Sequence, residues 1–195
     1  WQFGSRVESL HKAIEHLPRC ICVARVSKHA TFTFSTRDNV FSEQVIVVAT
    51  DSTSTLATLQ SRIHYVWANR RSTSHGDGIR YSHTDCFETF PFPREEHLRP
   101  DGDLERVGER LYTARARYMV ETQPPQGLTA TYNQVKDPDC NNPRILELRR
   151  LHEDLDRAVL AAYGWSEVPV PPYGTPTTPA EKKALEAFQD EILDR

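Results

Sequence analysis

The run FPFP (90–93) divides this chain into two parts with different residue patterns. Proline lacks a backbone N–H and has a fixed φ, so the run continues neither a helix nor a central strand. Before it, β-branched stretches alternate with loops, and after it apolar residues recur at helical spacing. The sequence therefore predicts an α+β fold: a small mixed or antiparallel sheet flanked by helices, followed by a helical C-terminal segment. We expect one domain over residues 1–93 and a helical segment over 94–195.

The first part is expected to hold three strands between two helices. The second strand alternates in polarity, which is typical of a half-exposed strand, whereas the third is a continuous β-branched run typical of a buried one. A capping box of Ser5 and Glu8 opens the first helix, and a cap near Ser54 opens the second, which runs to Arg70. The expected strands are residues 20–26, 31–35 and 44–50. A loop is expected after the second helix, over residues 71–78.

Three helices are expected after Pro93. The first carries an apolar stripe from Leu104 to Tyr118. The second is capped by Asn142, has Pro143 in its first turn and ends at Gly164. The third opens with Thr178-Pro179 and the capping-box residue Glu181.

Charge is distributed unevenly along the chain. The net charge is −3, whereas a free-standing nucleic-acid binder is usually basic. From Arg19 to Arg80, however, eight Lys and Arg residues face four acidic ones, and the acids dominate only after Pro93. A chain with this composition, no apolar run of about 20 residues and four scattered cysteines is expected to be cytoplasmic.

Several strings invite a catalytic or metal-binding interpretation that the residues do not support. VPPYG (170–174) resembles the catalytic motif of adenine amino-methyltransferases, but Val170 cannot accept a hydrogen bond from a target amino group. Cys20 and Cys22 lack the spacing of a structural zinc site, as does the loose pair His83 and Cys86. We expect the two strand cysteines to be small buried hydrophobic residues, and no metal or cofactor in this chain. The carboxylates at positions 147–156 alternate with arginines, as on a solvated, salt-bridged helix face.

Polar and cationic side chains gather instead at the turns of the first part. Arg25, Lys28 and His29 follow the first strand, and a second group surrounds the glycine-bearing loop before Arg80. Arginine can bind guanine with two hydrogen bonds, and lysine can hold phosphates. Loops are also polar simply because they are exposed, so the residues alone leave DNA reading as one interpretation among several.

Longer strings resemble a known family. Trp1, ARVSKHATFTF (24–34), LQSRIHYVWA (59–68) and RYSHTDCFETFPFP (80–93) resemble the target-recognition domain of MmeI-like DNA methyltransferases, which are fused type II restriction-modification and phage-defence enzymes. LTATYNQV (128–135) and LRRLHEDLDRAVLAAYGW (148–165) resemble the helical segment that follows it.

This resemblance implies a module that reads double-stranded DNA for a larger enzyme. That enzyme would bind S-adenosylmethionine in an upstream domain and methylate adenine at N6; whether it also cleaves DNA is left open. The implied partners are double-stranded DNA and the methyltransferase domain of the same protein. The expected DNA-binding residues are Arg25, Lys28, His29, Arg70, Arg71, His75, Asp77 and Arg80, and no catalytic residue is expected in this chain. Phe87, Phe90 and Phe92 are expected to be core anchors rather than base-stacking rings.

Two other functions stay open at this point. A protein-interaction scaffold would dock a methyltransferase or defence partner and would show an exposed apolar stripe on the helix at 143–163. A small hydrolase would show a pocket with convergent residues of perturbed pKa. A DNA reader, in contrast, would bring Lys28, Arg70, Arg71 and Arg80 to a basic groove.

Overall fold

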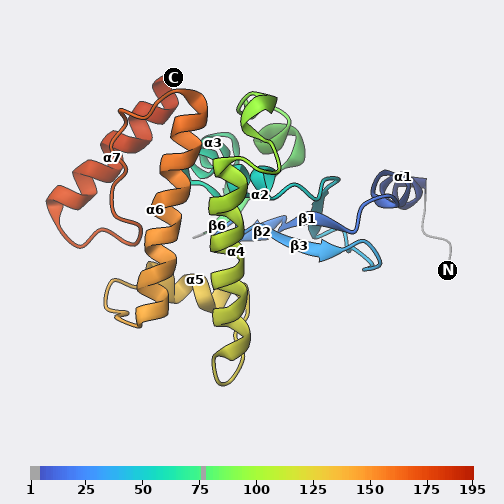
Figure 1. Cartoon of the computed structure of the whole chain (residues 1–195), viewed down its shortest axis with the longest axis horizontal. Coiled ribbons are helices and arrows are strands. Elements are labelled where there is room, and N and C mark those ends of the chain that lie inside the picture. The colour runs from blue at the N-terminus through green and yellow to red at the C-terminus, as the bar shows by residue number, and fades with distance from the viewer. Residues whose placement is uncertain (1–4, 76–77) are drawn as a thin grey trace.

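The computed structural model describes residues 5–75 and 78–195, and for residues 5–7 and 73–75 it describes the backbone (Figure 1). The first part of the chain contains short strands and helices, in the order α1 (Ser5–Ile14), β1 (Arg19–Ala24), β2 (Val26–Ser27), β3 (Thr33–Thr36), β4 (Val45–Val48), α2 (Thr53–Gln60), α3 (Arg62–Arg71), β5 (Thr73–His75) and β6 (Gly78–Arg80). The remainder is helical, with a single π-helical turn η1 (His83–Phe87), a 3-10 turn η2 (Glu95–His97), α4 (Asp103–Glu121), α5 (Leu128–Lys136), α6 (Pro143–Tyr163) and α7 (Pro179–Asp194). The α+β fold class predicted from the sequence is confirmed.

The larger sheet contains the three predicted strands in the order β3-β1-β4, all antiparallel. Central strand β1 is almost entirely buried, with Ile21 packed in the main core and Cys20 and Cys22 under α1. Edge strand β4 buries only Ile46, so its expected full burial is wrong. A continuous β-branched run can also stand at a sheet edge, because Val and Ile favour strands by their shape as well as by their burial.

The single helix expected from Ser54 to Arg70 is two helices. The backbone of Ser61 is extended (φ −69°, ψ 158°), and its hydroxyl accepts from the His64 N–H, so Ser61 caps α3 while closing α2. Ser52, not Ser54, caps α2. This break turns the side chain of Arg62 into the protein, although helical spacing places it on a polar face.

The stretch expected to be a loop at 71–78 contributes strands to a second, small sheet. Its order is β2-β6-β5, with Ser27 opposite Ile79 and Ile79 opposite Ser74. Residues 76–77 between β5 and β6 lie outside the described residues. Ile79 is buried, which anchors the hairpin to the core beneath it.

The FPFP run is the predicted rigid exit. Phe90 is buried, and Phe87 and Phe92 are partly buried against the same cores. The three rings meet edge to face, at 5.4 Å between Phe87 and Phe92 and 5.0 Å between Phe90 and Phe92. This geometry favours attraction between aromatic rings, so the prediction of core anchors is confirmed.

The C-terminal helices begin and end close to the predicted residues. Asn142 Oδ1 accepts from the backbone of α6, Gly164 ends that helix at φ 78°, and Thr178 and Glu181 form the capping box of α7. Helices α4 and α6 lie side by side, with β1 and β3 extending beyond α4 on one side and α7 beyond α6 on the other (Figure 1).

The apolar stripe of α6 faces inward. It consists of Ile145, Leu148, Leu151, Leu155 and Val159, all at most 4% exposed. Burial of each such side chain contributes about 1.5–3 kcal/mol before the entropy cost of folding. The exposed stripe that a docking scaffold requires is therefore not present on α6. Among the residues described, no helix is long and apolar enough to cross a membrane.

Candidate nucleic-acid interface

The second sheet brings four of the eight predicted DNA-binding residues together. Strand β6 pairs with β2, and the Tyr81 N–H donates to the Arg25 carbonyl oxygen at 2.8 Å. This places Arg25, the residue between β1 and β2, beside the strand that carries Arg80, with Lys28 and His29 in the turn that follows β2. Arg80 and Lys28 are exposed, whereas Arg25 is half-buried and donates from Nε to the Glu43 carbonyl oxygen.

The turn after β2 is fixed by contacts on both sides. Ala30 has a positive φ of 42°, a conformation that costs a residue with a side chain about 1 kcal/mol or more. The hydroxyl of Ser27 holds this residue by accepting from its N–H at 3.0 Å. His29 Nε2 lies 2.9 Å from Oδ1 of Asn133 on α5. Because burial lowers the pKa of His29, the ring is neutral at physiological pH, and Lys28 is the cation that this turn presents.

Arg70 and Arg71 lie at the end of α3, two to three residues before Thr73 of β5, which pairs with Arg80. They line a surface hollow with Asp190 and Asp194 of α7, and the Arg71 guanidinium lies 4.5 Å from the centre of the Trp67 ring. Lys28 lines a different cavity. The carboxylates of Asp190 and Asp194 reduce the positive potential around Arg70 and Arg71, whereas no Asp or Glu that the structure describes lines the cavity at Lys28.

Two further predicted readers, His75 and Asp77, cannot be placed as side chains. The backbone of His75 pairs with Gly78 at the end of the hairpin where β5 connects to β6, while its side chain and all of Asp77 lie outside the described residues. Their position in the chain is nevertheless next to Gly78 and Arg80 of β6.

Buried contacts hold β6 in place. The Tyr81 hydroxyl lies 2.8 Å from Nε2 of His64, and both side chains are 1% exposed. A Cβ on Gly78 would lie 2.8 Å from the carbonyl oxygen of Ser27, closer than such atoms approach in proteins. Glycine is therefore required at this position for β6 to pair with β2.

Sequence reasoning missed the ion pair that joins the two parts of the chain. Arg62 of α3 and Asp156 of α6 are both buried, with Nε 2.6 Å from Oδ2, and the backbone N–H of Arg62 donates to Oδ1 at 2.7 Å. Asp156 stands in a row of surface carboxylates, and its side chain turns inward because Arg62 balances its charge. The neighbouring Glu153 and Asp154 do pair with Arg157 on the solvated face, as predicted.

The two remaining guanidinium nitrogens of Arg62 explain VPPYG. Nη1 and Nη2 donate to the carbonyl oxygens of Pro172 and Pro171, so this loop completes the coordination of a buried guanidinium. Tyr173 is buried and stacks on His152, with ring centres 4.1 Å apart. The string VPPYG is thus a packing element. Its resemblance to a catalytic motif fails at the first position, where Val170 cannot accept a hydrogen bond.

A second buried arginine joins the same two parts. Arg115 of α4 donates to the Phe32 carbonyl oxygen at 2.8 Å, to Gln60 Oε1 and to the Tyr132 hydroxyl. In one step it thereby connects β3, α2 and α5. Nothing in its spacing distinguishes it from the exposed arginines of α4.

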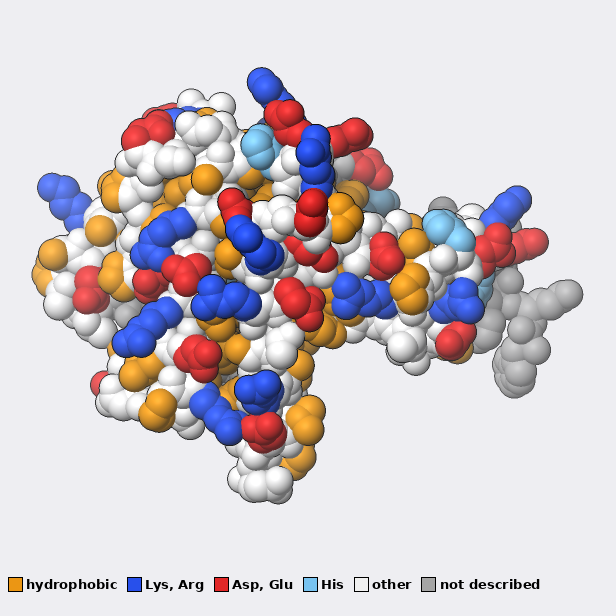
Figure 2. Space-filling view, viewed as in Figure 1, with side chains coloured by type: hydrophobic (Ala, Val, Ile, Leu, Met, Phe, Trp, Pro, Cys, Tyr) orange, Lys and Arg blue, Asp and Glu red, His pale blue; other side chains and the backbone are white. Residues whose placement is uncertain are grey.

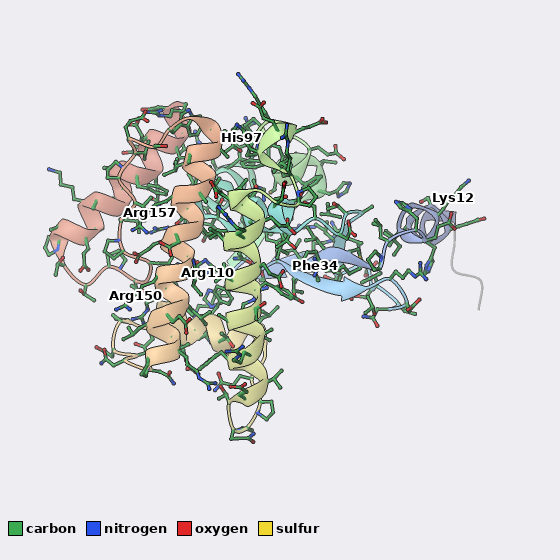
Figure 3. All side chains as sticks on the ribbon, viewed as in Figure 1. Lys12, Phe34, His97, Arg110, Arg150 and Arg157 are labelled. Atoms are coloured by element: carbon green, nitrogen blue, oxygen red, sulfur yellow. The ribbon has the colours of Figure 1, made fainter. Side chains whose placement is uncertain are left out.

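The outer face of α4 and α6 has mixed charge. Figure 2 shows Lys and Arg side chains intermingled with Asp and Glu over these helices, and Arg110, Arg150 and Arg157 lie on this face (Figure 3). A surface of this kind is suited to solvation rather than to binding a polyanion. The exposed basic residues near the second sheet, Lys28 and Arg80, are thus distinct from this mixed-charge face.

Cysteine and metal chemistry find no support in the described part of the chain. Cys20, Cys22 and Cys86 are buried, and burial raises the pKa of the Cys22 thiol to about 12. Groups of three or more His, Cys, Asp or Glu side chains that could hold a metal ion do not occur among the residues described.

Comparison with known proteins agrees with the position of this site. Residues 2–94 match the family described as "MmeI, target recognition domain". Residues 2–94 are a target recognition domain of the MmeI family. That region contains both sheets and every predicted DNA-binding residue.

A solved structure of the Type IIL restriction-modification enzyme MmeI in complex with DNA has a similar fold, with a TM-score of 0.61 at 20% sequence identity. The similarity covers 92% of this chain, so it extends through the helices after the MmeI target recognition domain. The chain spans 22% of the length of that enzyme. No curated protein matches the chain.

Proposed function

We propose that this chain reads a specific sequence in double-stranded DNA on behalf of a larger adenine-N6 methyltransferase. The observation that carries the proposal is the membership of residues 2–94 in the MmeI target recognition domain family. The solved enzyme of similar fold is described in complex with DNA, which supports DNA as the partner.

The geometry of the second sheet suits this role. Base reading needs side chains presented from a rigid support, with cations that position the phosphate backbone. Arg80 stands on a strand held by Tyr81 and Gly78, and Lys28 projects from a turn held by Ser27 and Asn133. We therefore assign base reading to Arg80 and the adjacent hairpin, and phosphate contact to Lys28.

Methyl transfer itself would take place outside this chain. Catalysis and binding of S-adenosylmethionine belong, in this proposal, to a methyltransferase domain of the same protein, and residues 94–195 would pack the reader against it. The chain is about a fifth of the length of the MmeI enzyme, which leaves room for such a domain in a protein of that size.

The test is to map methylated adenines in DNA from cells that express the whole protein. A single methylated sequence motif supports the proposal, and an unmethylated genome contradicts the methyltransferase assignment. Duplexes carrying that motif then test the reader. Arg80→Ala should weaken binding about 5- to 150-fold, corresponding to roughly 1–3 kcal/mol for one base contact.

Arg150→Ala is the matched control, because Arg150 is an exposed arginine on the mixed-charge face of α6 (Figure 3). Equal affinities of the two variants would remove Arg80 from the interface. Lys28→Ala should lower affinity equally for all sequences and reduce the dependence of binding on salt concentration, since a phosphate contact releases counterions.

A further inference from the structure

A cavity of about 130 Å³ lies where the target recognition domain meets the C-terminal helices. This volume is well above the roughly 10–15 Å³ that admits one water molecule. Its walls come from the turn after β2, from α2 and α3, from α5, and from Tyr173 and α7. The exposed side chains of Lys28 and Tyr65 stand among the lining residues and connect it with solvent.

The charge of the lining has one sign. Lys28, Arg62 and Lys136 line the cavity, and among its described lining residues there is no Asp or Glu. The nearby carboxylate of Asp156 already accepts two hydrogen bonds from Arg62. Asp156 balances the charge of Arg62, so Lys28 and Lys136 are the cations that give this partly enclosed space a positive potential, which an anion would neutralise.

Lys136 has no acceptor within the described part of the chain. Its ammonium nitrogen lies 4.0 Å from the centre of the Tyr173 ring and takes part in no hydrogen bond or ion pair there. Burial, reinforced by the charge of Arg62, lowers the pKa of Lys136 to about 8. A half-buried ammonium group that meets only an aromatic ring is incompletely solvated, and an anionic acceptor would supply the missing hydrogen bonds.

The His64–Tyr81 pair adds a second donor at the same wall. One hydrogen bond joins the Tyr81 hydroxyl to Nε2 of His64, and Nδ1 of His64 is buried without a partner. If Nε2 carries the proton, the hydroxyl hydrogen has no acceptor; if Nδ1 carries it, the Nδ1–H has none. In either tautomer one polar hydrogen beside the cavity stays unsatisfied, which costs about 1–3 kcal/mol.

We propose that this cavity is a binding site for a phosphate-bearing ligand. Lys28 and Lys136 would hold the phosphate, together with N–H or O–H groups of Arg62 and of the His64–Tyr81 pair in the cavity lining. Phe32, Tyr81 and Tyr132 are aromatic residues of the same lining, so a group attached to the phosphate would meet aromatic rings. The phosphate could be that of a free nucleotide or one from the backbone of bound DNA. This site is independent of Arg80 and of base reading.

The test measures binding of inorganic phosphate and of adenosine monophosphate to the whole protein by titration calorimetry. Both should bind, and Lys136→Gln should weaken both by at least tenfold. Lys183→Gln is the matched control, because Lys183 is an exposed lysine of α7 that makes the same change of charge away from the cavity. Equal binding by the two variants, or equal loss in both, overturns the proposal.

Lysine acylation read by mass spectrometry gives a second measurement on the unmodified protein. Phosphate or the nucleotide should protect Lys136 and leave Lys183 reactive. If only a DNA duplex protects Lys136, the phosphate is supplied by DNA; if none of the three protects it, the site does not exist. Since Arg80→Ala should leave this protection by the nucleotide unchanged, failure of the site and failure of DNA reading are distinguishable.

Discussion

Replacing Arg62 by methionine tests whether the buried ion pair holds the two parts of the chain together. In the folded protein the Arg62 side chain is 8% exposed and that of Asp156 is not exposed at all. Methionine keeps the apolar stem of Arg62 and the backbone N–H that donates to Asp156 Oδ1, but it removes the guanidinium charge and the bond from Nε to Oδ2. It also removes the donors to the Pro171 and Pro172 carbonyl oxygens.

The expected loss is large for one residue. Removing one partner of a buried ion pair costs about 3–5 kcal/mol, because an uncompensated charge stays buried. For a chain of this size, 1 kcal/mol shifts Tm by roughly 2–4 °C, so Tm should fall by roughly 6–20 °C. Arg157→Met is the control, because its pairs with Glu153 and Asp154 are exposed and worth about 0.2–1 kcal/mol.

Urea unfolding followed by circular dichroism measures these differences. The double variant Arg62→Met/Asp156→Leu should recover part of the loss, since replacing both ions by apolar residues removes the unpaired charge. The recovery stays partial because the proline carbonyl oxygens keep no donor. The reasoning is refuted if Arg62→Met costs less than about 1 kcal/mol, or if the double variant is no more stable than Arg62→Met.

Two further predictions concern pH and the reading hairpin. Burial lowers the pKa of His64 to about 3, below the value of about 6.5 in the unfolded chain, so the unfolded state binds the proton first. The contribution of His64 to the free energy of unfolding should therefore be complete above pH 6.5 and decline by up to roughly 1.4 kcal/mol per pH unit as pH falls from 6.5 toward 3. In urea titrations, His64→Gln should flatten this slope. His83→Gln, at an exposed position, should leave it unchanged. Gly78→Ala should destabilise the protein by about 1–3 kcal/mol and weaken DNA binding, because the new Cβ would meet the β2 backbone. Gly127→Ala, where a Cβ meets nothing within 4 Å, should cost only the roughly 0.5–1 kcal/mol of an alanine at the N-cap of α5 and should leave DNA binding unchanged. Equal effects of the two variants would contradict the close approach at β6.

The sequence predicted those elements whose determinants are local. Caps depend on residues within one turn, which is why Asn142, Gly164 and the Thr178–Glu181 box were recognisable. The strands of the larger sheet were found for the same reason, from their β-branched runs. The break at Ser61 was missed because Ser61 stands between two stretches in one helical phase, and a serine inside a helix pattern is common.

The residues of the candidate site were predictable in part, whereas the buried arginines that join the two parts of the chain were not. Position in the chain grouped Arg25 with Lys28, whereas Arg80 joins them through the pairing of β6 with β2, which the sequence did not predict. Arg62 and Arg115 were not recognisable, since an arginine becomes buried only when acceptors from distant segments converge on it. Those acceptors lie 17 to 110 residues away along the chain, and no local pattern encodes that convergence.

The inward-facing arginines have a consequence for protein engineering. Arg62, in the target recognition domain, donates to acceptors after residue 93, and Arg115, after residue 93, donates to acceptors in that domain. A recombination point at residue 93 would therefore separate each guanidinium from these partners. A chimera that exchanges DNA specificity between relatives would inherit mismatched interiors even if every reading loop were correct. Crossovers placed after Tyr173 would transfer the guanidinium contacts together with the loops. Such hybrids should fold, whereas hybrids joined at residue 93 should aggregate.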